Sequence, residues 1–195
     1  MLENSQCFFE VLLCIIIVPE RHLCFAEKLQ DFRVVARLGC RMEPCQPLKL
    51  LRFFEGTWTV FENIQKGEFF PKGGARTGTA KITPGPGRLS LVEDYHSNGS
   101  AGKLDLLAVI WWDSAGQIYR PLICANDGEG CVVRGTVHWQ GNTLINDYDA
   151  VVGGKKRKMR DSFVDITPTS FTLVAAVFTQ GSEWQPIITT RYRRQ

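Results

Sequence analysis

The chain lacks the motifs that mark most enzymes and metalloproteins. It has no Cys-x-x-Cys pair, and its three histidines (His22, His96 and His138) are scattered, so the ligand spacing of a zinc site is absent. It also has no nucleophile elbow and no phosphate-binding loop. The net charge of +3 is too small to indicate nucleic-acid binding without a clustered basic face. We therefore expect no metal, no cofactor and no nucleic-acid partner, and we assign no catalytic residue.

Helix-length segments are missing between Gly56 and Arg194. This region reads instead as about ten short strands separated by Gly-, Pro- and Asn-rich turns, most of them short enough for hairpins. Regularly spaced short strands with hairpin connections predict an all-β, antiparallel, up-and-down β-barrel of about 8–10 strands. The expected strands are 56–64, 75–83, 88–96, 103–113, 117–125, 130–139, 142–151, 156–166, 169–179 and 183–194.

The predicted strands carry polar residues where a packed core would exclude them. Segments 88–96 and 142–151 mix apolar and polar residues on both faces, and Glu93 and Asn146 are examples. An unpartnered buried polar group costs about 1–3 kcal/mol, so either these residues face outward or the lumen is partly wet. Segment 103–113 is apolar on both faces, which predicts that a plug helix, the tail or a partner covers it.

A short apolar helix is expected just before the first strand. Pro47 suits the first helical position and Gly56 the position after the end. Such a helix can plug one end of a barrel, which is wide enough at eight or more strands to hold a small ligand.

Residues 1–46 form a separate N-terminal tail. Residues 11–18 are an apolar run of signal-peptide length that is too short to span a bilayer, so we expect no integral membrane span. Ala26 suits a cleavage site, but Met1–Gln6 carries no positive charge and Glu10 precedes the run. Two interpretations stay open: a signal or pro-segment of a secreted or periplasmic protein, or an irregular tail of a cytoplasmic one.

Two of the seven cysteines lie inside the strand array. Cys124 and Cys131 flank a turn at 125–130 and can face each other across a hairpin. In an oxidising compartment they would form a disulfide, and otherwise they would be small buried apolar residues.

The start and end of the strand array resemble a known superfamily. Gly56-Thr57-Trp58 after a short helix, with an arginine on the last strand, resembles the calycins, which include lipocalins and fatty-acid-binding proteins. Residues 47–195 are similar to a bacterial lipocalin-like barrel family of unknown function. The resemblance implies that Trp58 packs under the closed end and that Arg191 or Arg193 lies across its ring in a cation–π contact. The other similar stretches are Leu50–Phe54, Gly102–Val109 with Trp112, Asp113 and Tyr119, Gly135–Val137 with Gly141–Thr143, Ile166–Phe171, and Gly181–Trp184.

The leading functional hypothesis is a binding module that holds a small hydrophobic or amphipathic molecule in the barrel. Aromatic side chains would give contact area and a few polar groups would fix orientation. The candidate lining residues are Tyr95, Trp112, Tyr119, Trp139, Tyr148 and Arg160.

Several alternatives remain beside this hypothesis. The same aromatic residues can simply fill the core, and the protein can be a structural or interaction protein that presents its outer wall. An enzyme is a third alternative, with the pair Tyr95 and His96 as the first residues to test. Haem is disfavoured, because a related haem-binding barrel family has a different sequence after its first-strand Trp and a His near the C-terminus, and here no His follows His138. The sequence leaves the oligomeric state open.

Overall fold

The computed structural model describes residues 50–126, 130–152, 154–179 and 182–195. The expectations for the tail, including its export signal, the domain boundary at residue 47 and five of the cysteines, lie outside the described residues. Within the described ranges, no helix is both long and apolar enough to cross a membrane.

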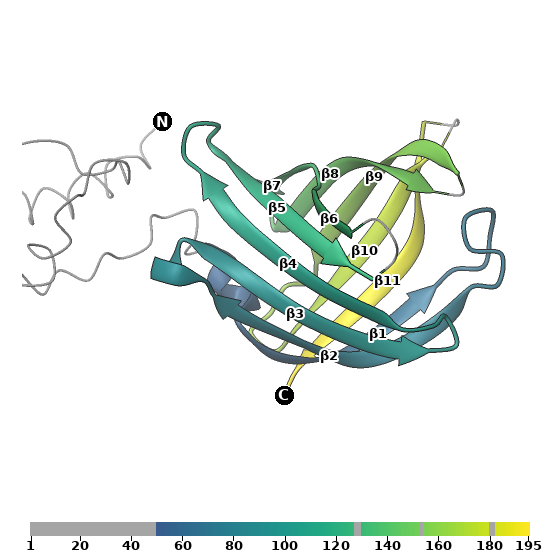
Figure 1. Ribbon diagram of the computed structural model, residues 1–195, viewed down its shortest axis with the longest axis horizontal. Helices are drawn as coiled ribbons and strands as arrows, with labels where there is room; N and C mark the ends of the chain where they lie inside the picture. The colour runs from purple at the N-terminus through teal and green to yellow at the C-terminus, as the bar shows by residue number, and fades with distance from the viewer. Residues whose placement is uncertain (1–49, 127–129, 153, 180–181) are drawn as a thin grey trace, which may run out of the picture. The chain divides into compact units, whose positions relative to one another are not determined.

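The described strands form one antiparallel sheet that closes on itself (Figure 1). Apart from β6 and β7, consecutive strands pair with each other, and the first strand pairs with the last. Two short strands, β6 and β7, both pair with β5 and share one place in the wall, so the ring has ten strand positions. This confirms the predicted up-and-down barrel. The strands are β1 (Gly56–Ile64), β2 (Gly74–Pro84), β3 (Ser90–Gly99), β4 (Leu104–Asp113), β5 (Ile118–Ala125), β6 (Gly130–Val133), β7 (Thr136–Gln140), β8 (Thr143–Val152), β9 (Lys155–Val164), β10 (Ser170–Phe178) and β11 (Trp184–Arg194).

The predicted strand 130–139 is interrupted at Arg134 and Gly135. Gly135 has a φ of +78°, and a Cβ atom there would lie 2.2 Å from the carbonyl oxygen of Asp147. The chain therefore presses against β8 at a point where only glycine fits. Beyond this point β7 pairs with β8, whereas β6 pairs with β5.

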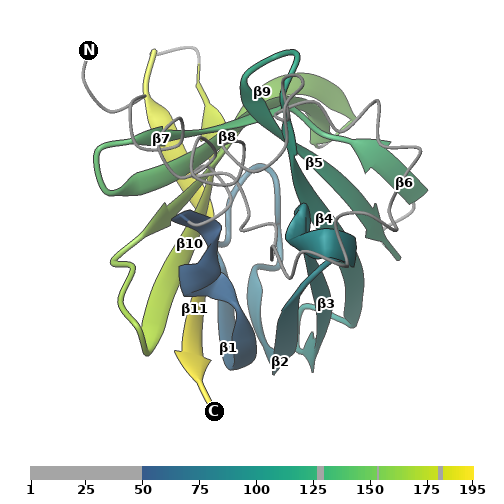
Figure 2. The same ribbon diagram turned by 90° about the vertical axis from the view of Figure 1, so that its left-hand side faces the viewer.

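One end of the barrel is closed by the helical turn η1 (Leu50–Phe54), which Figure 2 views from the front; a second turn, η2 (Pro86–Arg88), connects β2 to β3. The plug is a 3₁₀ turn of five residues. Leu51 and Phe54 are buried, and the Trp58 indole N–H donates a hydrogen bond of 2.8 Å to the Phe54 carbonyl. Phe54 and Trp58 each meet the ring of Phe171 edge-on at 4.9 Å. The predicted plug is thus present, and Trp58 packs beneath it.

The arginine that covers Trp58 is Arg194, which corrects the expectation of Arg191 or Arg193. Trp58 and Arg194 are cross-strand partners and share a face of the sheet, and the guanidinium carbon lies 4.3 Å from the indole centre. Arg191 and Arg193 point to the outer face, where Arg193 lies 6.0 Å from the ring of Phe61. The expected contact exists, but the assignment was wrong because side chains alternate along a strand.

Arg194 also ties three segments together through backbone carbonyls. Its guanidinium donates hydrogen bonds to the carbonyls of Glu55 at 2.7 Å and Phe53 at 3.2 Å, at the end of η1. A third bond of 2.6 Å goes to the Pro168 carbonyl in the turn before β10. The last strand therefore holds the plug in place.

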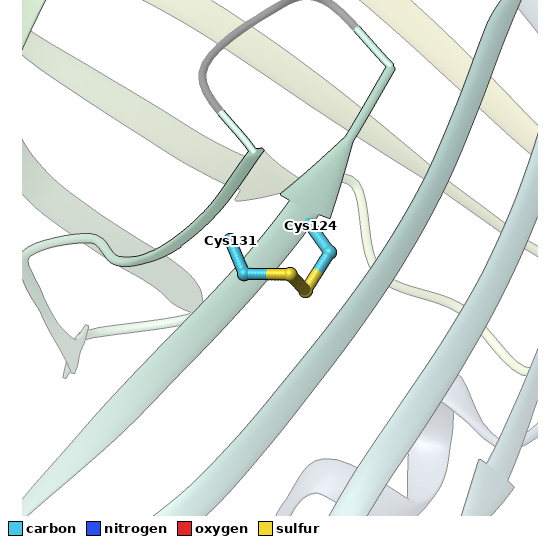
Figure 3. Close-up of a disulfide and its surroundings, with 2 residues drawn as sticks. All are labelled: Cys124 and Cys131. Carbon is cyan, nitrogen blue, oxygen red and sulfur yellow. A yellow bond between two sulfur atoms is a disulfide. The ribbon is translucent and has the colours of Figure 1, made fainter.

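A disulfide joins Cys124 and Cys131 across the hairpin of β5 and β6 (Figure 3). The two cysteines are direct cross-strand partners. Their neighbour on β4, Leu107, is 42% exposed, so the bridge lies on the outer face. The exposure of Leu107 also shows that η1 does not cover the outer face of β4 at this position.

Candidate functional site

The inner face of the barrel is more polar than a packed core. Glu62, Asn146 and Thr190 are almost fully buried, and Glu93 also points inward. The sequence left open whether Glu93 and Asn146 face outward or into the lumen. In the structure both face the lumen.

One inner carboxylate, Glu62, has a full set of donors. Arg76 on β2 forms a salt bridge and a hydrogen bond with its Oε1. The hydroxyls of Tyr95 and Thr190 donate to its Oε2 at 3.2 and 3.4 Å. Burial and the nearby carboxylate raise the pKa of Tyr95, so its hydroxyl stays protonated as a donor. The cluster is electrically balanced and explains why charged residues are tolerated inside.

A second inner carboxylate, Asp161, lies across the barrel on β9. The Tyr148 hydroxyl donates to it at 3.2 Å, and the Asn146 amide also hydrogen-bonds to it. The Arg134 guanidinium lies 5.5 Å from the centre of the Tyr148 ring. Burial raises the pKa of Asp161 to about 6, while these neighbours oppose the rise.

A cavity lies between η1 and the barrel lumen. About 40 Å³ of it accepts the centre of a water-sized molecule, which is room for a few waters and marks a small site. Its described lining consists of nine apolar residues and one carboxylate: Leu51, Phe54, Ile82, Leu91, Ala108, Ile110, Leu144, Phe163, Phe171 and Glu93.

Glu93 is the single ionisable group in that described lining. It sits on β3 between Ile82 of β2 and Ala108 of β4. The Tyr192 hydroxyl of β11 donates to its Oε1 at 3.2 Å. Burial raises the pKa of Glu93 to about 7, although the Tyr192 bond opposes the rise. A carboxyl group in this position can hold a hydrogen-bonding group of a bound molecule or exchange a proton with it near neutral pH.

Five of the six predicted lining residues do point inward, but none belongs to the described lining of the apolar cavity. Tyr95 takes part in the Glu62 cluster and Tyr148 in the Asp161 cluster. Trp112 meets Tyr119 edge-on at 4.9 Å, and burial raises the pKa of Tyr119 to about 12. Trp139 is the cross-strand partner of the buried Leu144.

Arg160 is on the outer face, which corrects its assignment to the lining. Its guanidinium forms two hydrogen bonds with the Asp147 carboxylate, at 2.7 and 3.0 Å, and lies 4.4 Å from the centre of the Trp184 ring. Its neighbours Met159 and Asp161 occupy the inner face, so alternation turns Arg160 outward.

The pair proposed for an enzyme is split by the same alternation. Tyr95 is inside the barrel, whereas His96 is exposed outside it and bonded to Asp105 at 2.9 Å and Asp94 at 3.0 Å. The Asp105 hydrogen bond is the main factor that raises the pKa of His96. Within the described part of the chain, no three His, Cys, Asp or Glu side chains gather as a metal site.

Sequence reasoning missed Glu62, Arg76 and the role of Glu93 in a cavity. The signal for Glu93 was present, because Leu91, Glu93 and Tyr95 share one face of their strand. Glu62 had the same kind of signal, between Val60 and Ile64. Neither pattern alone reveals which carboxylate has an arginine opposite it.

Comparison with known proteins supports the fold. No family model and no curated protein matches the chain. Among solved structures, the chain is similar to Rv2717c from M. tuberculosis, with 12% identity, 78% of this chain and 99% of that chain covered, and a TM-score of 0.53. Two designed barrels also match: a de novo designed fluorescence-activating β-barrel (14% identity, 74% and 95% covered, TM-score 0.41) and the redesigned barrel mFAP0 bound to DFHBI (13%, 73% and 99%, TM-score 0.40).

Proposed function

We propose that this protein is a calycin-like, lipocalin-type barrel that binds a small hydrophobic or amphipathic molecule in the cavity beneath η1. The observation that carries the proposal is the cavity lining, which combines nine apolar residues with one carboxyl group. Small-molecule sites in proteins are concave and mostly apolar, with a few polar groups that fix orientation. The small cavity favours a ligand of few heavy atoms.

The Cys124–Cys131 disulfide supports a further part of this proposal, namely that the protein is exported to a periplasmic or extracellular space. Disulfides persist mainly in oxidising compartments. The proposal includes a bacterial source, which depends on the resemblance of residues 47–195 to a bacterial barrel family. Secretion is tested by separating cell fractions and finding in which of them the full-length or processed chain accumulates.

Binding is tested with small neutral probes, such as ethanol and propanol, by ligand-observed NMR on the folded protein. Ala108→Leu places extra volume in the cavity lining and should abolish binding. Ala150→Leu is a matched control, because Ala150 packs against the buried cluster of Met159 and Val177, outside the described cavity lining. In parallel, native mass spectrometry of protein from its own source should reveal a co-purified small molecule. Absence of any bound molecule together with equal probe signals in both variants would contradict the proposal.

An interaction role is the second candidate, and the outer wall provides its observation. Leu107 of β4 and Val133 of β6 are 42% and 59% exposed on strands that both pair with β5. A monomeric mass in light scattering across the accessible concentration range would argue against self-association through this wall.

A further inference from the structure

Two inward-facing carboxylates, Glu62 on β1 and Glu93 on β3, have different partners in the fold. Glu62 receives the Arg76 guanidinium and two hydroxyl donors. Among the described residues, the Tyr192 hydroxyl donates a hydrogen bond to Glu93, and no basic side chain belongs to the described lining around it. The Arg76 charge is already matched by Glu62, so no described basic side chain is left to serve as a countercharge for Glu93.

An ionised carboxylate with open acceptor positions in apolar surroundings is costly. Protonation of the carboxylate, or a cation that enters the site, would lower this cost. A ligand ammonium group would supply both the countercharge and hydrogen-bond donors, and charge-assisted bonds of this kind are about twice as strong as neutral ones. A ligand carboxylate would bring a second negative charge to the same apolar space and would be rejected.

We propose, resting on the proposed function, that the cavity selects small apolar amines and that the Glu93 carboxylate binds their ammonium group. The apolar body of the amine would contact Ile82, Leu91, Ile110 and the aromatic rings of the plugged end. This ligand class is opposite in charge to fatty acids.

The test uses two matched series on the full chain, sized for the small cavity: ethylamine, ethanol and acetate, and propylamine, propanol and propanoate. Dissociation constants are measured by NMR titration at pH 7.5 for the wild type, for Glu93→Gln and for Asp94→Asn. Asp94→Asn is the control, because it removes a carboxylate from the exposed outer face next to Glu93. We expect each amine to bind about tenfold more tightly than its alcohol, which corresponds to about 1.4 kcal/mol, and the acids to bind more weakly than the alcohols.

Glu93→Gln should remove the preference for amines, so that each amine binds no more tightly than its alcohol, while Asp94→Asn should behave as the wild type. Alcohol binding without a preference for amines would overturn this inference and leave the proposed function standing. Failure of all six probes would overturn both. The comparison of amine with alcohol is made within the wild type, so it holds even when the glutamine variant fails to fold.

Discussion

Replacing Arg194 by alanine should lower the free energy of unfolding by about 2–4 kcal/mol. The guanidinium lies over Trp58 and donates to three carbonyls that belong to the end of η1 and to the turn before β10. At an exposed position the cation–π contact is worth about 0.5–1 kcal/mol. Each hydrogen bond adds about 0.5–1 kcal/mol at the low end of its range, because the side chain is partly hydrated.

Arg193→Ala is the matched control. Arg193 is the preceding residue on the same strand but points outward, and its contact with Phe61 is at 6.0 Å, the limit for a cation–π interaction. We expect a change within about 0.5 kcal/mol for this variant. Arg194→Lys should fall between the two, because lysine retains the charge but cannot bond three carbonyls with one planar group.

The assay is urea unfolding at neutral pH, followed by circular dichroism and by tryptophan fluorescence. Coincident transitions from the two probes establish two-state behaviour before free energies are compared. Equal losses in Arg194→Ala and Arg193→Ala would refute the reasoning, since the plug would then be held by something other than the last strand.

Three further predictions concern stability. Replacing Cys124 and Cys131 together by serine should lower the free energy of unfolding by about 2 kcal/mol, because the disulfide closes a short loop. Urea midpoints of the wild type with and without dithiothreitol check this, and an unchanged midpoint would contradict it. Burial raises the folded-state pKa of Glu93 from 4.5 to about 7, so the free energy of unfolding of the wild type should fall as pH rises through that window. Relative to the wild type, Glu93→Gln should therefore be more stable by up to about 3 kcal/mol at pH 8 and no more stable at pH 4. A difference that does not depend on pH would contradict this prediction. Gly135→Ala should destabilise the protein by about 3 kcal/mol or more, because its Cβ would clash with the backbone of β8. Gly141→Ala, at φ +60° with open space around it, should cost about 1 kcal/mol. Equal losses of stability in thermal unfolding would show that the chain does not approach β8 tightly at Gly135.

Strand positions could be predicted from the sequence because their signals are local. Turn residues and alternation at each hairpin depend on a few neighbouring residues, and the expected strands agree closely with β1 to β11. The break at Gly135 could not be predicted in this way, because it depends on the approach of β8, a strand that follows later in the chain.

The errors at Arg160 and at the Trp58 contact have one physical cause. In the segment around Arg160 both faces carry charged residues, so alternation within the strand does not say which face is inside. The answer lies in the register with β8, where Arg160 is opposite Asp147. On the last strand, the inward pattern of Thr190 and Tyr192 extends to Arg194, and counting from those residues would have found it.

Predicting the cavity requires both the residue pattern along each strand and the register between the folded strands. Each carboxylate on an apolar strand face is visible in the sequence, but only the folded register shows that Arg76 meets Glu62 and that Glu93 meets Ile82 and Ala108. An interior optimised for stability alone would pair Glu93 as it pairs Glu62 or replace it with an apolar residue. Glu93 instead keeps a raised pKa in an apolar cavity, at a cost to folding above neutral pH. Such a departure from local consistency is typical of functional positions, and a bound cation is the simplest group that would offset its cost.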